Sequence, residues 1–210
     1  MVISFVNAKG GTGKTTAAIN LALAMAGAAP ETRVALVDAD PQRSCLDTLA
    51  GHERGNLTLY AAPDKPHKII EALTEKVIVA DTAGHSSESG WQVAAVSSLV
   101  VIPIGASPLD VRAVAATVKA LDVIKEKFNP RLECRFLLNQ MTPRTSLAGE
   151  IRETIERLYP FQVMRTELAT RQAYRQSLVD GLSVIEYDRH SKAAQEITAL
   201  VVEIGGLMNK

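Results

Sequence analysis

The chain has 210 residues and a hydrophobic fraction of 47%, which are typical of a globular domain and exclude a disordered protein. Its 23 Lys and Arg residues balance 23 Asp and Glu residues, so a protein that is basic over its whole surface is excluded. Aromatic residues make up 4%, too few for a stacking platform that binds single-stranded nucleic acid. An enzyme or a binding module of the α/β kind remains.

Short apolar runs alternate along the chain with longer segments that carry apolar residues at helical spacing. The runs predict strands at 2–6, 34–37, 57–60, 77–80, 99–102 and 134–138. The other segments predict helices at 15–27, 66–75, 88–97, 109–128, 146–158, 169–179 and 191–204. Because the strands are apolar throughout and are separated by helices, they predict a single doubly wound, mostly parallel sheet with helices on both faces. The sequence has no repeat or linker, so residues 1–210 are expected to form one α/β domain.

The cysteines and the uncharged segments bear on the cellular compartment. Cys45 and Cys134 are 89 positions apart, which excludes a paired-cysteine zinc or iron–sulfur motif and is typical of reduced cytosolic thiols. Residues 15–30 resemble the apolar region of a signal peptide. They follow a predicted strand and a glycine-rich turn, however, which argues against a signal peptide. Residues 89–109 are uncharged but are interrupted by polar residues and prolines, so they predict a helix and a strand. We expect a cytoplasmic protein.

The most informative motif lies between the first predicted strand and the first predicted helix. It reads Ala8-Lys9-Gly10-Gly11-Thr12-Gly13-Lys14-Thr15-Thr16. Glycines let the backbone wrap a phosphate chain, and the helix N-terminus that follows favours an anion. In such a loop the lysine reaches the terminal phosphates and the hydroxyl binds magnesium, which assigns these roles to Lys14 and Thr15.

This loop resembles that of the ParA/MinD group of P-loop ATPases, whose deviant Walker A motif reads K-G-G-x-G-K-[ST]. Ala8 stands where the usual motif has its first glycine, and Lys9 is the additional lysine. The resemblance implies that Lys9 crosses a dimer interface to the phosphates bound by the other subunit. A second cation there could stabilise transition-state charge as an arginine finger does. The alternative is that Lys9 is a solvated residue at the rim.

Acidic residues follow two of the predicted strands, in Asp38-Ala39-Asp40-Pro41-Gln42 and in Asp81-Thr82-Ala83-Gly84. Carboxylates at the carboxyl ends of parallel strands face the crevice where ligands bind. The first string resembles the switch I of ParA proteins, which implies that Asp40 positions the hydrolytic water and Asp38 supports the magnesium shell. Asp81 matches the Walker B aspartate, with residues 82–90 as switch II and His85 as a nucleotide sensor or a solvated loop residue. Alternatively, Asp38 and Asp40 only cap turns.

The last predicted strand ends in Asn139, where a guanine-specific protein would read N-K-x-D. The resemblance implies that Asn139 contacts adenine, so ATP with Mg²⁺ is expected in preference to GTP. The predicted ATP-binding residues are Lys9, Gly10, Gly11, Thr12, Gly13, Lys14, Thr15, Thr16 and Asn139, with Thr15, Asp38 and Asp81 for magnesium and Lys9, Lys14 and Asp40 for catalysis.

Nine of the thirteen arginines lie at or after residue 131. Segments 170–175, 181–187 and 191–197 also resemble ParA proteins, in particular the short plasmid-type (ParF-like) members and the McdA-like positioning ATPases. The resemblance implies that C-terminal basic residues bind duplex DNA without sequence preference. The predicted residues are Arg165, Arg171, Arg175, Arg189 and Lys192, with Arg171 and Arg175 on one helix face. Alternatively, they are surface residues balanced by Glu167, Asp180, Glu186 and Asp188.

The resemblance implies an ATP-dependent homodimer that binds nucleoid DNA and hydrolyses ATP slowly until a small ParB-like or McdB-like activator stimulates it. The cargo would be a plasmid, a chromosome or another body. A MinD-like membrane-cycling ATPase would need a basic amphipathic C-terminal helix, but residues 196–210 contain one lysine, so no membrane partner is expected. A metabolic ligase of the dethiobiotin synthetase type agrees poorly with Lys9 and with the string at 38–42.

Overall fold

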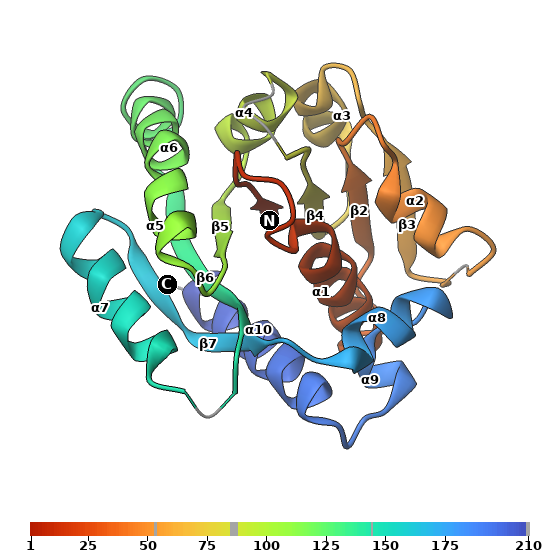
Figure 1. The fold of residues 1–210 in the computed structure, drawn as a ribbon. Coiled ribbons are helices and arrows are strands. Elements are labelled where there is room, and N and C mark those ends of the chain that lie inside the picture. Colours follow the sequence, from red (N-terminus) through yellow and green to blue (C-terminus); the bar gives the residue numbers. More distant parts are fainter. Residues whose placement is uncertain (53, 85–87, 144, 209–210) are drawn as a thin grey trace.

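A computed structural model of the chain describes residues 1–52, 54–84, 88–143 and 145–208 (Figure 1). The strands in chain order are β1 (Val2–Phe5), β2 (Val34–Asp38), β3 (Leu57–Ala61), β4 (Val77–Asp81), β5 (Leu99–Ile104), β6 (Glu133–Met141) and β7 (Gln162–Ala169). The helices are α1 (Lys14–Ala28), α2 (Ser44–Leu49), α3 (Pro66–Ala72), α4 (Glu88–Ala95), α5 (Pro108–Ala113), α6 (Ala115–Lys127), α7 (Leu147–Leu158), α8 (Gln172–Val179), α9 (Val184–Tyr187) and α10 (Lys192–Met208).

The seven strands form one sheet in the order β3-β2-β4-β1-β5-β6-β7, and every neighbouring pair is parallel. The predicted doubly wound parallel sheet is therefore confirmed. The order reverses on either side of β1, which is the point where open α/β sheets bind ligands at their carboxyl edge. The register pairs Asp38 of β2 with Asp81 of β4, so the two predicted magnesium carboxylates end neighbouring strands.

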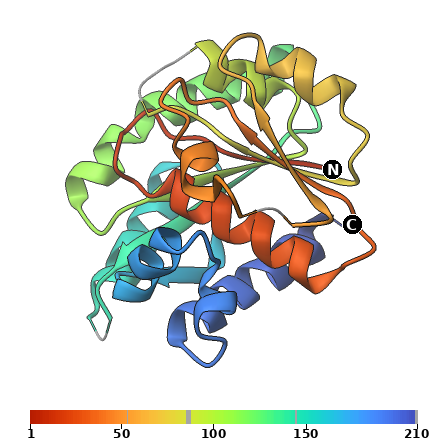
Figure 2. The same cartoon turned by 90° about the vertical axis from the view of Figure 1, so that its right-hand side faces the viewer.

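Helices cover both faces of the sheet because alternate side chains of each strand point to opposite sides. On one face, Ile3, Phe5 and Leu36 pack with α1, α2 and α10. On the other face, one cluster joins β5 and β6 to α5, α6 and α7, and a second joins β2 and β4 to α3 and α4. The view turned by 90° about the vertical axis shows α1 beside α10 (Figure 2).

The lack of charged residues in α1 after Lys14 is explained by the position of the helix. Ten of its residues are buried, because α1 contacts the sheet on one side and α10 on another. A helix that is buried on most of its circumference is apolar on all sides. The sequence of α1 therefore resembles the apolar region of a signal peptide. Among the described residues, no helix is both long and apolar enough to cross a membrane.

The structure differs from the predicted elements in four places. β7 was not predicted, because exposed and half-buried residues, among them Arg165 and Glu167, interrupt its apolar run at the edge of the sheet. The short helices α2 and α9, of six and four residues, were also missed, because they are too short to show a helical period. The predicted helix at 109–128 is interrupted at Val114, whose ψ of −14° separates α5 from α6.

Candidate nucleotide-binding site

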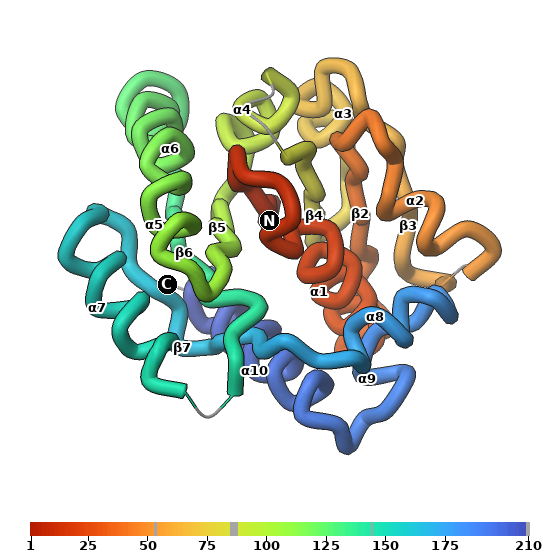
Figure 3. The backbone as a smooth tube through the Cα atoms, viewed as in Figure 1, coloured from red at the N-terminus to blue at the C-terminus, as the bar shows by residue number. Residues whose placement is uncertain are grey.

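The predicted phosphate loop connects β1 to α1 at the carboxyl edge of the sheet, near the centre of the molecule (Figure 3). Its residue Gly13 is the N-cap of α1 and has a φ of 83°, in the left-handed region that favours glycine. A Cβ atom at this position would also lie 2.3 Å from Nδ2 of Asn139, so no larger residue fits. The loop therefore brings a helix N-terminus, with its unpaired N–H groups, to the ligand-binding edge.

Lys14 is the first residue of α1 and is buried, with 6% of its surface exposed. Its Nζ donates to the carbonyl oxygen of Lys9 at 3.3 Å. Burial lowers the pKa of Lys14, and the charges of Asp81 and Asp40 act in the opposite direction. Lys14 borders a hollow of about 710 Å³, which is also lined by Gly10, Gly11, Gly13, Thr15, Thr16, Asp40, Pro41, Gln42, Thr82, Ala83, Gly84 and Gln140. A buried cation at a helix N-terminus is suited to bind an anion in this hollow.

Asp81 has the features of a magnesium carboxylate. It is fully buried, and its Oδ2 accepts a hydrogen bond from the hydroxyl of Thr15 at 2.6 Å. Its Oδ1 has no hydrogen-bond partner among the described residues. An orphaned buried carboxylate oxygen beside a hydroxyl is an arrangement that a hard divalent cation completes, so these residues fit Mg²⁺.

Asp38 is buried beside Asp81, but its oxygens are already engaged by backbone N–H groups. Oδ2 accepts from Cys45 at 2.9 Å and from Leu46 at 3.2 Å, and Oδ1 accepts from Asp40 at 3.1 Å. Burial raises the pKa of Asp38, although these hydrogen bonds lower it. The carboxylate therefore ties the start of α2 to the end of β2, and its part in the magnesium shell stays a prediction.

Cys45 belongs to this cluster and was not predicted there. Its Sγ lies 3.5 Å from Oδ2 of Asp81, and the thiol, Asp38 and Asp81 place ligand atoms within 4.8 Å of one another. Burial and the two carboxylates raise the pKa of Cys45 well above its ordinary value, so the thiol is protonated and a donor. Both cysteines are free and buried, as predicted for reduced thiols.

The charge state of Asp81 gives a prediction for the metal-free protein. Burial raises its pKa from 3.8 to about 7, so between these values the folded protein holds a proton that the unfolded chain has released. The free energy of unfolding should therefore fall as pH rises through this range, by at most about 1.4 kcal/mol per pH unit. The variant Asp81→Asn should flatten this dependence, as measured by urea unfolding in EDTA. The exposed-site control Asp64→Asn should keep it, and an equal slope in Asp81→Asn would contradict the assignment.

Asp40 both caps a turn and borders the hollow. Its Oδ1 accepts from the N–H of Gln42 at 2.9 Å, which is the turn-capping alternative, yet the residue also lines the 710 Å³ hollow. Gly84 approaches from the other side, and a Cβ there would lie 2.9 Å from Cα of Gly10. The first residues of both predicted switch segments therefore lie beside the phosphate loop. Residues 85–87 of switch II, including His85, lie outside the described residues.

Lys9 is partly exposed and is held by a carboxylate. Its Nζ forms an ion pair with Oδ1 of Asp110 in the first turn of α5, and the side chains are 40% and 13% exposed, respectively. Its backbone N–H donates to Oδ1 of Asn7 at 2.9 Å. In this single chain the additional lysine is thus held by a carboxylate of its own subunit. Its role across a dimer interface stays a prediction.

A second, adjoining hollow of about 300 Å³ lies on the Asn139 side of the loop. Its lining residues are Gly13, Thr16, Ala17, Asn139, Gln140, Leu168, Ala169, Thr170, Arg171, Tyr174 and Arg175. The amide of Asn139 is 7% exposed and donates through Nδ2 to the carbonyl oxygen of Thr12 at 2.7 Å. The hollow is placed where a nucleoside would extend from the phosphate site, but the Asn139 side chain binds the loop. Its contact with adenine stays a prediction.

Arg171 does not lie where its sequence suggested. It is the N-cap of α8 with an extended backbone, so it does not share a helix face with Arg175. Its guanidinium binds Glu196 of α10, with Nε donating at 2.7 Å and Nη2 at 2.6 Å. The partner of Arg171 is therefore not one of the four acidic residues that were expected to balance the predicted DNA-binding residues. It is Glu196, which approaches from another helix. Arg171 and Arg175 nevertheless border the same 300 Å³ hollow.

The other predicted DNA-binding residues lie at different places along α10. Arg189 and Lys192 are exposed at the turn that precedes α10 and at its first residue. Arg165 is exposed on the edge strand β7, where its backbone N–H donates to Glu203 of α10 at 2.7 Å. Residues 192 and 203 are separated by about 16 Å along a helix, so the five residues are dispersed, and their contact with DNA stays a prediction.

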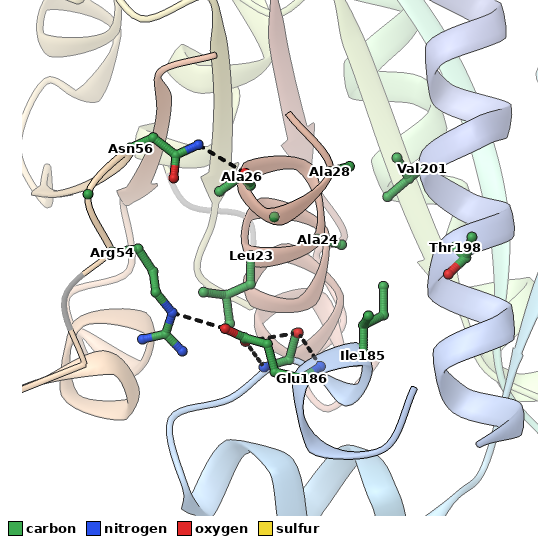
Figure 4. Close-up of a pocket in the computed structure, with 13 residues that line it drawn as sticks. Leu23, Ala24, Ala26, Ala28, Arg54, Asn56, Ile185, Glu186, Thr198 and Val201 are labelled. Atoms are coloured by element: carbon green, nitrogen blue, oxygen red, sulfur yellow. Dashed lines mark hydrogen bonds and ion pairs between the residues drawn. The ribbon is translucent and has the colours of Figure 1, made fainter. Parts of the chain in front are cut away.

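A further hollow, of about 670 Å³, lies at the far end of α1, between α1, α9 and α10 (Figure 4). Its polar side chains bind one another or the backbone. Arg54 donates to Glu186 at 3.1 Å, and Asn56 donates to the carbonyl oxygen of Ala26 at 2.9 Å. None of the predicted site residues lines it, so the chemistry of the described residues is concentrated at the other end of α1.

Comparisons with known proteins agree with this geometry. Residues 3–184 match the model of the CobQ/CobB/MinD/ParA nucleotide-binding domain. The maintenance of carboxysome distribution protein A of Halothiobacillus neapolitanus is 30% identical over 96% of this chain and 95% of its own length. Protein virC1 of Rhizobium radiobacter is 29% identical over 82% of this chain and 78% of its own length.

Solved structures share the fold. A Cyanothece McdA variant in complex with ATP superposes with a TM-score of 0.79, at 14% identity, over 97% of this chain and 96% of that one. MinD of Pyrococcus horikoshii with Mg-ADP gives a TM-score of 0.76, at 20% identity, over 99% of this chain and 96% of that one. At these identities the likeness concerns the fold, and it agrees with the parallel seven-stranded sheet described above.

Proposed function

The chain belongs to the CobQ/CobB/MinD/ParA family of nucleotide-binding proteins, and on this basis we propose that it is an ATPase that positions a cellular cargo in the manner of McdA. The observation that carries this proposal is that Lys14, Thr15 and Asp40 line one hollow beside the N-terminus of α1, where the hydroxyl of Thr15 donates to the buried Asp81. The family resemblance of the sequence and the 30% identity to a carboxysome distribution protein supply the biological class.

ATP and Mg²⁺ are the proposed cofactors. The triphosphate lies along the loop from Gly10 to Thr16, with Lys14 against its terminal phosphates. The hydroxyl of Thr15 and the orphaned oxygen of Asp81 hold the metal ion, and Asp38 supports them through the start of α2. Bound Mg²⁺ neutralises charge that develops on the phosphates. The nucleoside occupies the 300 Å³ hollow next to Asn139.

Hydrolysis depends on Asp40 as the residue that orients the attacking water. Asp40 is the carboxylate of switch I that lines the phosphate hollow. Its Oδ1 caps the turn, and its other oxygen takes no part in that hydrogen bond. Loss of γ-phosphate would release the segment that follows β2 and the segment that follows β4, because both meet the loop at this hollow. A slow basal rate leaves the timing of hydrolysis to a partner protein.

We further propose that ATP closes a homodimer in which Lys9 reaches the phosphates of the partner subunit. This movement requires the ion pair between Lys9 and Asp110 to open, because one ammonium group cannot serve both sites. A small activator of the ParB or McdB type then stimulates hydrolysis. A membrane-cycling protein like MinD and a phosphate-loop ligase remain the alternatives, and the experiment below distinguishes the first of them by its binding to liposomes.

The DNA part of this proposal predicts that the chain co-sediments with plain duplex DNA in ATP but not in ADP or without nucleotide. The double variant Arg189→Glu with Lys192→Glu should weaken this retention on the order of tenfold, because each basic residue near a phosphate adds affinity through counterion release. The control Lys127→Glu with Arg131→Glu has the same change of charge on exposed residues and should retain DNA. Equal retention by both double variants, or ATP-dependent binding to liposomes in place of DNA, would contradict the proposal.

A further inference from the structure

Two neighbouring carboxamides at the end of β6 hold two consecutive carbonyl groups of the phosphate loop. Nδ2 of Asn139 donates to the carbonyl oxygen of Thr12 at 2.7 Å. Nε2 of Gln140 donates to the carbonyl oxygen of Gly11 at 2.9 Å. The contacts join residues more than 120 positions apart in sequence, so they are a product of the fold rather than of local turn chemistry.

These contacts determine where the N–H groups of the loop point. A peptide group is planar, and in its trans form the N–H of one residue points opposite to the carbonyl of the residue before it. Holding the carbonyls of Gly11 and Thr12 toward β6 therefore turns the N–H groups of Thr12 and Gly13 away from β6. In the described part of the chain, no N–H between Gly10 and Gly13 donates to a protein acceptor. These donors remain available to a ligand.

We propose that Asn139 and Gln140 are positioning residues that orient the loop N–H groups toward the phosphate chain. This inference rests on the nucleotide binding proposed above and extends it. It assigns a role to Gln140, which borders both the phosphate hollow and the nucleoside hollow. For Asn139 it adds a contact with the loop to the adenine contact that the family resemblance implies.

The backbone of Gln140 supports this assignment. Its φ is +58°, in the left-handed region that is uncommon for a residue with a side chain. Three contacts hold it there: its N–H donates to Oδ1 of Asn139 at 2.9 Å, its carbonyl accepts from the hydroxyl of Thr170 at 3.0 Å, and its amide binds Gly11. An unfavourable backbone that the surroundings enforce is typical of functional sites. Here the conformation aims the Gln140 side chain at the loop.

The side chain of Asn139 is fixed against the loop. Nδ2 donates one of its two N–H groups to Thr12, and Oδ1 accepts from the N–H of Gln140. A Cβ atom at Gly13 would lie 2.3 Å from Nδ2, so the amide packs closely on the loop. Phosphate binding by the loop preserves both hydrogen bonds.

The test compares ATP with sodium tripolyphosphate, each with Mg²⁺, by isothermal titration calorimetry. Gln140→Met keeps the length of the side chain and removes its donor, and Asn139→Leu does the same at the neighbouring position. Each variant should bind tripolyphosphate about three- to tenfold more weakly than the wild type, because one net hydrogen bond is lost. Gln140→Met should lose ATP affinity by the same factor and should keep the ratio of ATP to GTP affinity.

A matched variant separates the donor from the backbone conformation. Gln140→Gly accommodates the positive φ at no steric cost but lacks the amide, so it should be at least as stable as the wild type and still bind both ligands more weakly. Gln140 is exposed, so its variants are expected to fold even if Asn139→Leu does not.

Weaker ATP binding with unchanged tripolyphosphate binding would overturn the inference in favour of a base contact. Unchanged binding of both ligands by Gln140→Met would overturn it as well. If the wild-type protein binds neither ligand, the proposed function is overturned. That outcome is measured on the wild type alone, so it is distinct from a failure of the inference, which is measured on the variants.

Discussion

Lys14→Ala is expected to abolish nucleotide binding while leaving the protein folded. Lys14 is the one buried lysine among the described residues, and its ammonium group lies at the N-terminus of α1 beside the phosphate hollow. A lysine in this place makes charge-assisted hydrogen bonds to phosphate oxygens, and losing them should weaken ATP binding on the order of a hundredfold or more. Calorimetry with ATP and Mg²⁺ measures the loss.

The folded state should tolerate this change because the lysine has a single resting contact, with the carbonyl of Lys9. A thermal unfolding scan should therefore give a midpoint close to that of the wild type. Lys119→Ala, on the exposed side of α6, is the matched control and should bind ATP normally. Retained affinity in Lys14→Ala would remove the phosphate loop from the proposed function.

The sheet and the phosphate loop could be predicted from the sequence because their signals are local. Strands that are apolar up to a final aspartate, such as β2 and β4, stand out in any window, and glycines followed by Lys14 indicate a phosphate loop. β7 could not be predicted in the same way, because polar residues interrupt its apolar run at the edge of the sheet. The interruption at Val114 also leaves no mark in the apolar periodicity.

The contacts that define the site could not be predicted, because they join residues far apart in the chain. Asp110 lies 101 positions from Lys9, and Glu196 lies 25 positions from Arg171. Nothing in the sequence near Lys9 or Arg171 indicates these partners, and nearby acids were the natural candidates. Cys45 was missed for the same reason, because its place beside Asp81 depends on the pairing of β2 with β4.

These long-range contacts describe a chain whose cations are restrained before any ligand binds. Lys9 is held by Asp110, Lys14 donates to the carbonyl of Lys9, and Arg171 is held by Glu196. Each restraint involves a carboxylate or a carbonyl, and an anionic phosphate oxygen is an acceptor that can take its place. The proposed cycle would then replace contacts within one chain by contacts to ATP, to a second subunit and to DNA.

Asp40→Asn is expected to reduce the rate of ATP hydrolysis on the order of a hundredfold while ATP binding and ATP-dependent dimerisation persist. The asparagine retains an oxygen that accepts from the N–H of Gln42, so the turn after β2 is preserved. It lacks the negative charge that orients and activates water for attack on the γ-phosphate. A phosphate-release assay measures the rate, and light scattering with ATP measures the dimer.

The substitution separates the two interpretations of Asp40. If the side chain only caps the turn, Asn is as good a residue as Asp and the rate stays at the wild-type level, which would contradict a catalytic role. If the carboxylate acts on water, the dimer accumulates in ATP and is not released. Asp47→Asn, an exposed acid in α2, changes the charge of the same region and should hydrolyse ATP normally. A lost rate in Asp40→Asn with a normal rate in Asp47→Asn therefore assigns the effect to the one carboxylate that lines the phosphate hollow after β2.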